Sequence, residues 1–491
     1  MTRVPPLPVS QSIDSLRKAR CILKHEGQHA SALQTVAKVI KSIDGPLGIM
    51  ITKHPRMTLT TAFIAGILLT LGFKDLYPYL KRRIRRQRWR SSPSTTPASV
   101  LGEGTRKVTL EDNSASNHLE VSISDISEGI GGCIGDTPLI RIKSLSEATG
   151  CEILGKAEFL NGAGNSPKDR VALSMIQMAE EEGLLTPHSG DAVYEGTVGS
   201  TGISSTFYPA PWILLKEMNS AHTPLIISCM PDDQATEKSD LLLKLGAKVE
   251  RVRPASIVDQ NQFVNKARSR AAEHTADPSR QGRGFFADQF ENTANWRAHH
   301  SSTGPEIYRQ CGGHLDAFVA GAGTGGTISG CALFLKPKLP NMKVVLADPQ
   351  GSGLFNRIKY GVMFAPTERE GTRRRHQVDT IVEGIGINRV TANFEAAKEL
   401  VDDAIRVNDE QAMAMARWLV EKDGIFVGSS SAVNCVAAVK VAMQLGAGNR
   451  IVTILCDSGT RHLSKFWARA GNVGGKADTK LEDVLNAGYE Q

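Results

Sequence analysis

The strongest chemical signal in the sequence is a glycine-rich loop, GAGTGGT, at residues 321–327. It follows a short apolar run, DAFVA, and precedes a helical pattern. Glycines let backbone N–H groups approach an anion, and the start of the next helix adds positive potential. Because neither Gly-Lys-Ser nor a matching acidic residue follows, the loop is neither a Walker motif nor a dinucleotide fingerprint. The alternative without a ligand is a tight strand–helix turn. The loop favours phosphate binding by Gly323, Thr324, Gly325, Gly326 and Thr327.

A lysine in the sequence SPKDR, Lys168, lies just before a second helical pattern. The positive end of a helix lowers the pKa of a neighbouring amine and favours its nucleophilic, neutral form. Taken alone, such a lysine is more often a solvated surface residue. A phosphate site combined with an activated lysine, however, is what a pyridoxal phosphate Schiff base needs.

Two further loops are rich in glycine and hydroxyl groups. TVGSTG, at residues 197–202, follows an apolar strand pattern, and its N–H groups are suited to binding a carboxylate. GSSS, at residues 428–431, opens a helical pattern, and a serine N-cap is its alternative interpretation.

Together with four other motifs, these segments resemble the cysteine synthase branch of the fold-type II pyridoxal phosphate enzymes. That branch includes the O-acetylserine sulfhydrylases and the core of the cystathionine β-synthases. The resemblance extends from about Ile134 to about Trp467, two thirds of the chain. In order, the motifs are SPKDR, TVGSTG, QFEN, TGPEI, GAGTGGT, EGIG, GSSSA and DSGTRHL.

The resemblance implies roles for individual residues. Lys168 holds the aldehyde of pyridoxal 5'-phosphate and later acts as general base, residues 323–327 cradle the phosphate, and Ser430 faces the pyridine nitrogen. Gly384 lines the cleft, and no metal is implied. The substrate carboxylate loop consists of Thr197, Val198, Gly199, Ser200 and Thr201, with Gln289 beside it and Ser200 also contacting the cofactor.

The implied reaction is a β-replacement. O-Acetyl-L-serine loses acetate to give an α-aminoacrylate, and sulfide then adds to give L-cysteine. There are three alternatives. Two are enzymes: a cystathionine β-synthase that uses a different thiol, and a dehydratase. The third is a catalytically weak, membrane-tethered scaffold that keeps the cofactor. Relatives are homodimers, so a homodimer is expected.

The sequence departs from the family pattern at two places. The familiar TSGNTG loop is TVGSTG here, so Val198 replaces a serine and Ser200 an asparagine. The segment Ser205–Cys229 is about ten residues longer than in relatives, and it contains Pro209 and Pro211, which interrupt the expected helix. It is either an insertion with adapted function or a mis-spliced stretch.

The elements around these motifs predict an α/β protein of two lobes with mostly parallel, twisted sheets. Ligands in such sheets bind beyond the carboxyl ends of the strands. The expected strands are 151–157, 191–194, 225–229, 248–252, 317–320, 343–347 and 450–455, and the expected helices are 171–182, 237–245, 264–273, 304–311, 408–422 and 431–445.

Ahead of this catalytic domain, expected over 119–475, residues 57–73 form a run of 17 residues without a charge. As a helix this run would nearly span a membrane, and the basic residues after it place its C-terminal side in the cytosol. A single-pass anchor resembling those of the mitochondrial outer membrane is therefore predicted. The endoplasmic reticulum and a buried soluble helix are the alternatives. The layout resembles the fungal cysteine synthase 2-like group, with an N-terminal extension (1–56), a basic flank and linker (74–118), and a C-terminal tail (476–491).

Composition narrows the function further. The chain has 491 residues and a formal net charge of +7, but residues 74–90 alone hold eight basic residues and one acidic residue. Because the excess lies beside the apolar run, no nucleic-acid partner is expected. The eight cysteines have no metal-ligand spacing, which is typical of reduced thiols.

Overall fold

The computed structural model describes residues 129–186, 189–207, 226–363, 380–473 and 479–489, all within one compact unit, Leu119–Gln491. The predicted extension, anchor and linker lie outside these residues, as do residues 208–225 of the long segment. No helix within the described ranges is long and apolar enough to cross a membrane.

The larger lobe is built on a six-stranded sheet in the order β1-β2-β10-β7-β8-β9. All neighbours in this sheet run parallel except β1, which pairs antiparallel with β2. The strands are β1 (Leu139–Arg141), β2 (Glu152–Ala157), β10 (Arg450–Leu455), β7 (Ala317–Gly321), β8 (Lys343–Pro349) and β9 (Asp403–Val407).

The smaller lobe is built on a four-stranded, all-parallel sheet in the order β5-β4-β3-β6. The strands are β5 (Lys248–Val252), β4 (Ile226–Pro231), β3 (Ala192–Gly196) and β6 (Gly284–Phe286). The two sheets confirm the prediction of an α/β fold with mostly parallel strands.

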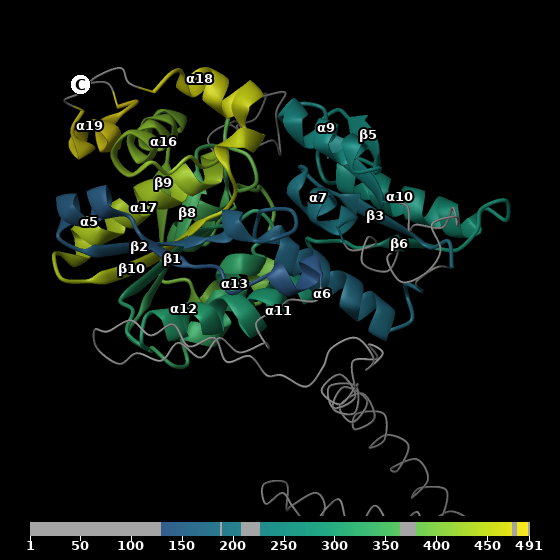
Figure 1. Ribbon diagram of the computed structural model, residues 1–491, viewed down its shortest axis with the longest axis horizontal. Coiled ribbons are helices and arrows are strands. Elements are labelled where there is room, and N and C mark those ends of the chain that lie inside the picture. Colours follow the sequence, from purple (N-terminus) through teal and green to yellow (C-terminus); the bar gives the residue numbers. More distant parts are fainter. Residues whose placement is uncertain (1–128, 187–188, 208–225, 364–379, 474–478, 490–491) are drawn as a thin grey trace, which may run out of the picture. The chain divides into compact units, whose positions relative to one another are not determined.

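Helices cover both faces of each sheet (Figure 1). Alternate residues of β7 enter different cores: Ala317 and Val319 pack on the side of α16 and α17, whereas Phe318 and Ala320 pack on the side of α12 and α13. The larger lobe contains α5 (Lys143–Thr149), α11 (Ala294–Ala298), α12 (Gly304–Gln310), α13 (Gly326–Leu335), α14 (Leu354–Tyr360), α15 (Ala392–Glu395), α16 (Asp409–Asp423), α17 (Ser429–Leu445), α18 (Ala468–Ala470) and α19 (Leu481–Asn486), and the smaller sheet is flanked by α6 (Lys168–Glu181), α7 (Ser200–Thr206), α9 (Thr236–Lys244) and α10 (Phe263–Ala276).

Seven predicted strands and six predicted helices are present, with ends shifted by a few residues. The strands β1, β6 and β9 were not predicted, since they are short and follow no clear alternation. The segment expected as a C-terminal tail contains α19, whose Leu481 and Val484 are buried in the larger lobe. This part of the tail is therefore a packed helix.

Candidate functional site

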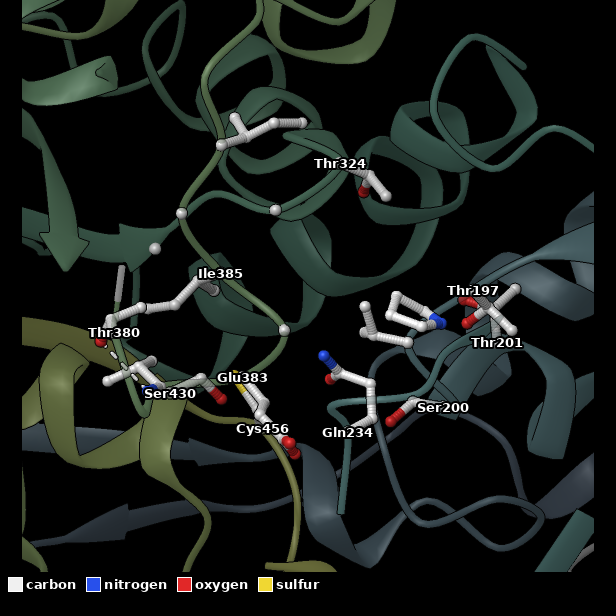
Figure 2. Close-up of a pocket in the computed structure, with 18 of the residues that line it drawn as sticks. Thr197, Ser200, Thr201, Gln234, Thr324, Thr380, Glu383, Ile385, Ser430 and Cys456 are labelled. Atoms are coloured by element: carbon white, nitrogen blue, oxygen red, sulfur yellow. Dashed lines mark hydrogen bonds between the residues drawn. The ribbon is translucent and has the colours of Figure 1, made fainter. Parts of the chain in front are cut away.

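A cavity of about 1060 Å³ opens at the carboxyl ends of the strands, and both lobes contribute to its lining. This is where parallel α/β sheets bind ligands. Figure 2 shows Thr197, Ser200 and Thr201 on one side of this pocket and Ser430 and Cys456 on the other. Every site residue predicted from the sequence lines the cavity except Gly199: Lys168, Thr197, Val198, Ser200, Thr201, Gln289, Gly323, Thr324, Gly325, Gly326, Thr327, Gly384 and Ser430.

Lys168 is the first residue of α6, and Pro167 precedes it as the N-cap. Burial lowers the pKa of its amine, and the neighbouring Cys456 and Asp457 only partly oppose this effect. Within the part of the chain that the structure describes, no hydrogen bond holds its Nζ. From the sequence, the helix end was expected to lower this pKa. In the structure, burial is the largest cause.

The carboxylate of Asp169 fixes the loop before Lys168. It accepts hydrogen bonds from the backbone N–H of Gly164 at 2.8 Å and from the hydroxyl of Ser204 at 2.5 Å. Ser204 belongs to α7, which follows the TVGSTG loop. The segment that presents the lysine is thereby connected to the helix that follows the substrate loop.

The phosphate loop tolerates only glycine at Gly323, Gly325 and Gly326. A Cβ added to Gly323 would lie 2.2 Å from the carbonyl oxygen of Gly384, and one added to Gly326 would lie 1.9 Å from Oδ1 of Asn295. Gly325 is the N-cap of α13 with φ of 85° and has no side chain to cap the helix, and the N–H of Gly326 makes a long hydrogen bond, 3.4 Å, to the hydroxyl of Thr324. The N–H groups of the next residues in this turn are available to an anion.

A buried histidine that the sequence analysis missed supports this loop. Nε2 of His299 lies 3.2 Å from the hydroxyl of Thr327, and Nδ1 lies 2.9 Å from that of Thr303. Burial lowers the pKa of His299 to about 3, so the ring is neutral at physiological pH. Its only sequence signal was its place just before TGPEI.

Ser430 lies in the first turn of α17 and is buried beside Cys456. Burial raises the pKa of the Cys456 thiol to about 11, so this side chain is uncharged. The side chain of Asn434 connects two strands of this wall. It accepts a hydrogen bond from the N–H of Gly321 in β7 at 2.8 Å and donates one to the carbonyl of Ile454 in β10 at 2.8 Å. Neither Cys456 nor Asn434 was predicted, because neither stands in a glycine-rich motif.

The substrate loop and Gln289 are in direct contact. The hydroxyl of Thr201 donates to Oε1 of Gln289 at 2.5 Å, and Nε2 of Gln289 donates to the carbonyl of Gly196 at 2.8 Å. Ser200 and Thr201 open helix α7, so the second half of the predicted loop is helical. Gly199 has φ of 128° and faces Lys238, which explains why it does not line the cavity.

These residues fit pyridoxal phosphate. The cavity contains a buried amine that has no hydrogen-bond partner among the described residues, a glycine-rich loop at a helix start, and a serine hydroxyl on the wall that carries Cys456. A phosphate, an aldehyde and a ring nitrogen are the groups that such a set receives.

Comparisons with known proteins agree with this donor set. The model of the pyridoxal-phosphate dependent enzymes matches residues 130–457. Cysteine synthase 2 of Emericella nidulans is 65% identical, over 89% of this chain and 99% of that protein, and cysteine synthase 2 of Neurospora crassa is 59% identical, over 88% and 96%. The crystal structure of O-acetylserine dependent cystathionine β-synthase from Helicobacter pylori has a TM-score of 0.57 at 30% identity, over 69% of this chain and 98% of that one. The chain therefore belongs to the cysteine synthase family of pyridoxal-phosphate dependent enzymes.

Proposed function

We propose that this protein makes L-cysteine from O-acetyl-L-serine and sulfide. The observation that carries the proposal is the cavity: a buried lysine amine, a phosphate loop and a carboxylate loop line one space. The near full-length similarity to cysteine synthase 2 of Emericella nidulans supports the choice of product.

Bound pyridoxal phosphate supplies an electron sink for the Cα carbanion of the amino acid. Lys168 would hold the cofactor at rest, and its Nζ would then take the Cα proton and later return it. Burial lowers the pKa of this amine, which favours the unprotonated form that a base requires. Gly323 to Thr327 would hold the phosphate, and the hydroxyl of Ser430 would bind the ring nitrogen.

The substrate loop orients the amino acid by its carboxylate. The loop's N–H groups and the hydroxyl groups of Thr197 and Ser200 are its donors, and Gln289 fixes Thr201 from behind. Val198 adds no hydroxyl, so the loop binds mainly through backbone groups. Acetate leaves from Cβ, and sulfide takes its place with the sulfur forming the new bond.

The test is cysteine formation by the purified full chain from O-acetyl-L-serine and sulfide, measured together with the visible absorbance of the bound cofactor. We expect the absorbance to shift on adding O-acetyl-L-serine and to return on adding sulfide. A cofactor band that no amino acid shifts would contradict the proposal and favour the scaffold alternative. Lys168→Ala is the matched negative control.

A second candidate nucleophile is a larger thiol. The solved relative from Helicobacter pylori is a cystathionine β-synthase that depends on O-acetylserine, and the cavity has the room for a thiol longer than sulfide. Homocysteine and sulfide should be compared as nucleophiles after the same first half-reaction. A kcat/KM for homocysteine above that for sulfide would make cystathionine the product.

We further propose that residues 57–73 anchor the enzyme in the mitochondrial outer membrane with the catalytic domain in the cytosol. Their lack of charge and the basic flank support this, as does a relative from Saccharomyces cerevisiae, 53% identical over 73% of this chain, whose name describes it as mitochondrial. Carbonate extraction and protease protection of isolated mitochondria test the proposal. Recovery in the endoplasmic reticulum, or in the carbonate supernatant, would contradict it.

A homodimer is proposed on the family resemblance. Light scattering of the purified catalytic domain in detergent-free buffer should give twice the mass of that domain. A monomer at all concentrations would count against the homodimer.

A further inference from the structure

A buried ion pair that belongs to none of the predicted site residues crosses between the two lobes beside the cavity. Lys238 of α9 and Glu383, which precedes Gly384, form a hydrogen-bonded pair whose side chains are 2% and 1% exposed. Glu383 also accepts from the backbone N–H of Ala235 at 3.0 Å. The smaller lobe thus holds this carboxylate through both a side chain and the backbone.

The lysine end of the pair contacts the substrate loop. A Cβ added to Gly199 would lie 2.9 Å from both Cβ and Cδ of Lys238, so the lysine stem packs directly against this glycine. Gly199 lies between Thr197 and Ser200, two of the three loop residues that carry hydroxyl groups. Any shift of Lys238 therefore moves the middle of the substrate loop.

The glutamate end contacts the phosphate loop. The carbonyl oxygen of the next residue, Gly384, lies so close to Gly323 that no Cβ fits there, and the N–H of Gly386 donates to the carbonyl of Ala322 at 2.9 Å. The N–H of Glu383 donates to the hydroxyl of Ser429 at 3.0 Å, one residue before Ser430. Glu383 thus stands on the wall that receives the cofactor.

The surrounding charges keep Glu383 ionised. Burial raises its pKa, but Lys238 and then His462 outweigh this and hold it below the usual value. Lys465 lies 3.5 Å from Oε1, and Nδ1 of His462 lies 3.6 Å from Oε2. Nε2 of His462 lies 3.0 Å from Asp457, whose charge partly opposes the lowering of the Lys168 pKa by burial.

We propose that the Lys238–Glu383 pair is a positioning element that sets the substrate carboxylate loop against the phosphate loop. This proposal rests on the proposed function, since it takes the substrate loop to bind an amino acid. A buried pair has this capacity because it is directional and costly to separate, whereas an apolar contact of the same size can slide. Figure 2 shows Glu383 between the wall of Ser430 and the wall of Ser200.

The experiment compares three variants of the full chain loaded with cofactor. Glu383→Gln removes the charge with little change of shape. Lys238→Met/Glu383→Leu replaces the pair by apolar groups, a change that is often neutral for stability. Glu237→Ala is the matched control, because it removes two hydrogen bonds that Ser464 of the larger lobe donates to α9, the helix that carries Lys238, without touching the substrate loop.

We expect both pair variants to raise the KM for O-acetyl-L-serine by about 10-fold or more, with kcat and cofactor absorbance changed far less. Hydrogen exchange of residues 197–206, measured without substrate, should accelerate in both. The double variant should unfold near the wild-type temperature yet keep the raised KM. Glu237→Ala should change neither KM nor exchange.

An unchanged KM and unchanged exchange in the double variant would overturn the proposal and leave the pair a purely stabilising contact. Equal effects in Glu237→Ala would overturn the proposal as well, since any contact between the two lobes would then position the substrate loop. If the wild-type chain makes no cysteine, the proposed function fails, and the exchange measurement alone still decides the positioning role.

Discussion

The wall of the cavity that carries the phosphate loop is built mainly from backbone, whereas the wall that carries the substrate loop is held by side chains. Gly323 and Gly326 have no room for a side chain, and the N-cap of α13, Gly325, has none. In contrast, Thr201 is held by Gln289, and Gly199 is held by Lys238. A backbone site is specified by one motif, but a side-chain site depends on residues from distant segments.

The largest effect should come from changing Lys168, whose amine both holds the cofactor and takes the proton of the substrate. Lys168→Ala is expected to lower kcat by at least about 10³-fold, because it removes the cofactor attachment and the general base together. Cysteine formation and cofactor absorbance measure the two losses separately. Lys143→Ala, which removes an exposed lysine, should leave both unchanged. Near-normal turnover by Lys168→Ala would refute the assignment of the base.

Gly323→Ala should break the backbone wall alone. The added methyl group would overlap the carbonyl of Gly384, and overpacking of this kind costs about 1–3 kcal/mol. Cofactor affinity, measured by titrating the apoprotein, should fall accordingly, while the KM for O-acetyl-L-serine in the saturated enzyme changes less. Gly131→Ala is the control, because no atom lies within 4 Å of its added Cβ. An unchanged affinity in Gly323→Ala would argue that phosphate binds elsewhere.

Thr201→Val should weaken the substrate wall alone. Valine keeps the shape but removes the hydroxyl that donates to Gln289, at a net cost of about 1 kcal/mol. The KM for O-acetyl-L-serine should therefore rise about 5-fold, with cofactor affinity unchanged. A loss of cofactor without a change in KM would reverse the two roles.

Val198→Ser should have the smallest effect and the opposite sign. The change restores the hydroxyl found in the familiar loop, and one added hydrogen bond is worth about 0.5–1.5 kcal/mol. The kcat/KM for O-acetyl-L-serine should rise a few-fold at unchanged cofactor affinity. A fall would indicate that the loop prefers another amino-acid substrate.

The difference between the walls also explains how far the sequence could predict the site. GAGTGGT and SPKDR each join a strand or loop to a helix within a few residues, so their chemistry is local and was predicted with the right elements. Lys238 and Glu383 are 145 residues apart, and although Glu383 stands in the EGIG motif, nothing local in the sequence indicates that the two side chains are paired. His299 and Asn434 were not predicted for the same reason, because each acts through contacts with distant segments.

The fold shows the same division. The long apolar strands β7, β8 and β10 were predicted almost to the residue, because buried parallel strands give strong continuous runs. The short β1 and β6 are strands only because a neighbouring strand pairs with them. Likewise, α19 is held by burial of two apolar residues against the larger lobe rather than by its own length.

The sequence by itself determined the fold class and the cofactor and indicated candidate residues to hold it, because strand periodicity, glycine loops and an activated lysine are local features. The tertiary structure decided how the substrate side is held, since that depends on buried polar contacts between segments far apart in the chain. It also decided the cause of the low pKa of Lys168, because burial depends on both lobes closing around the amine.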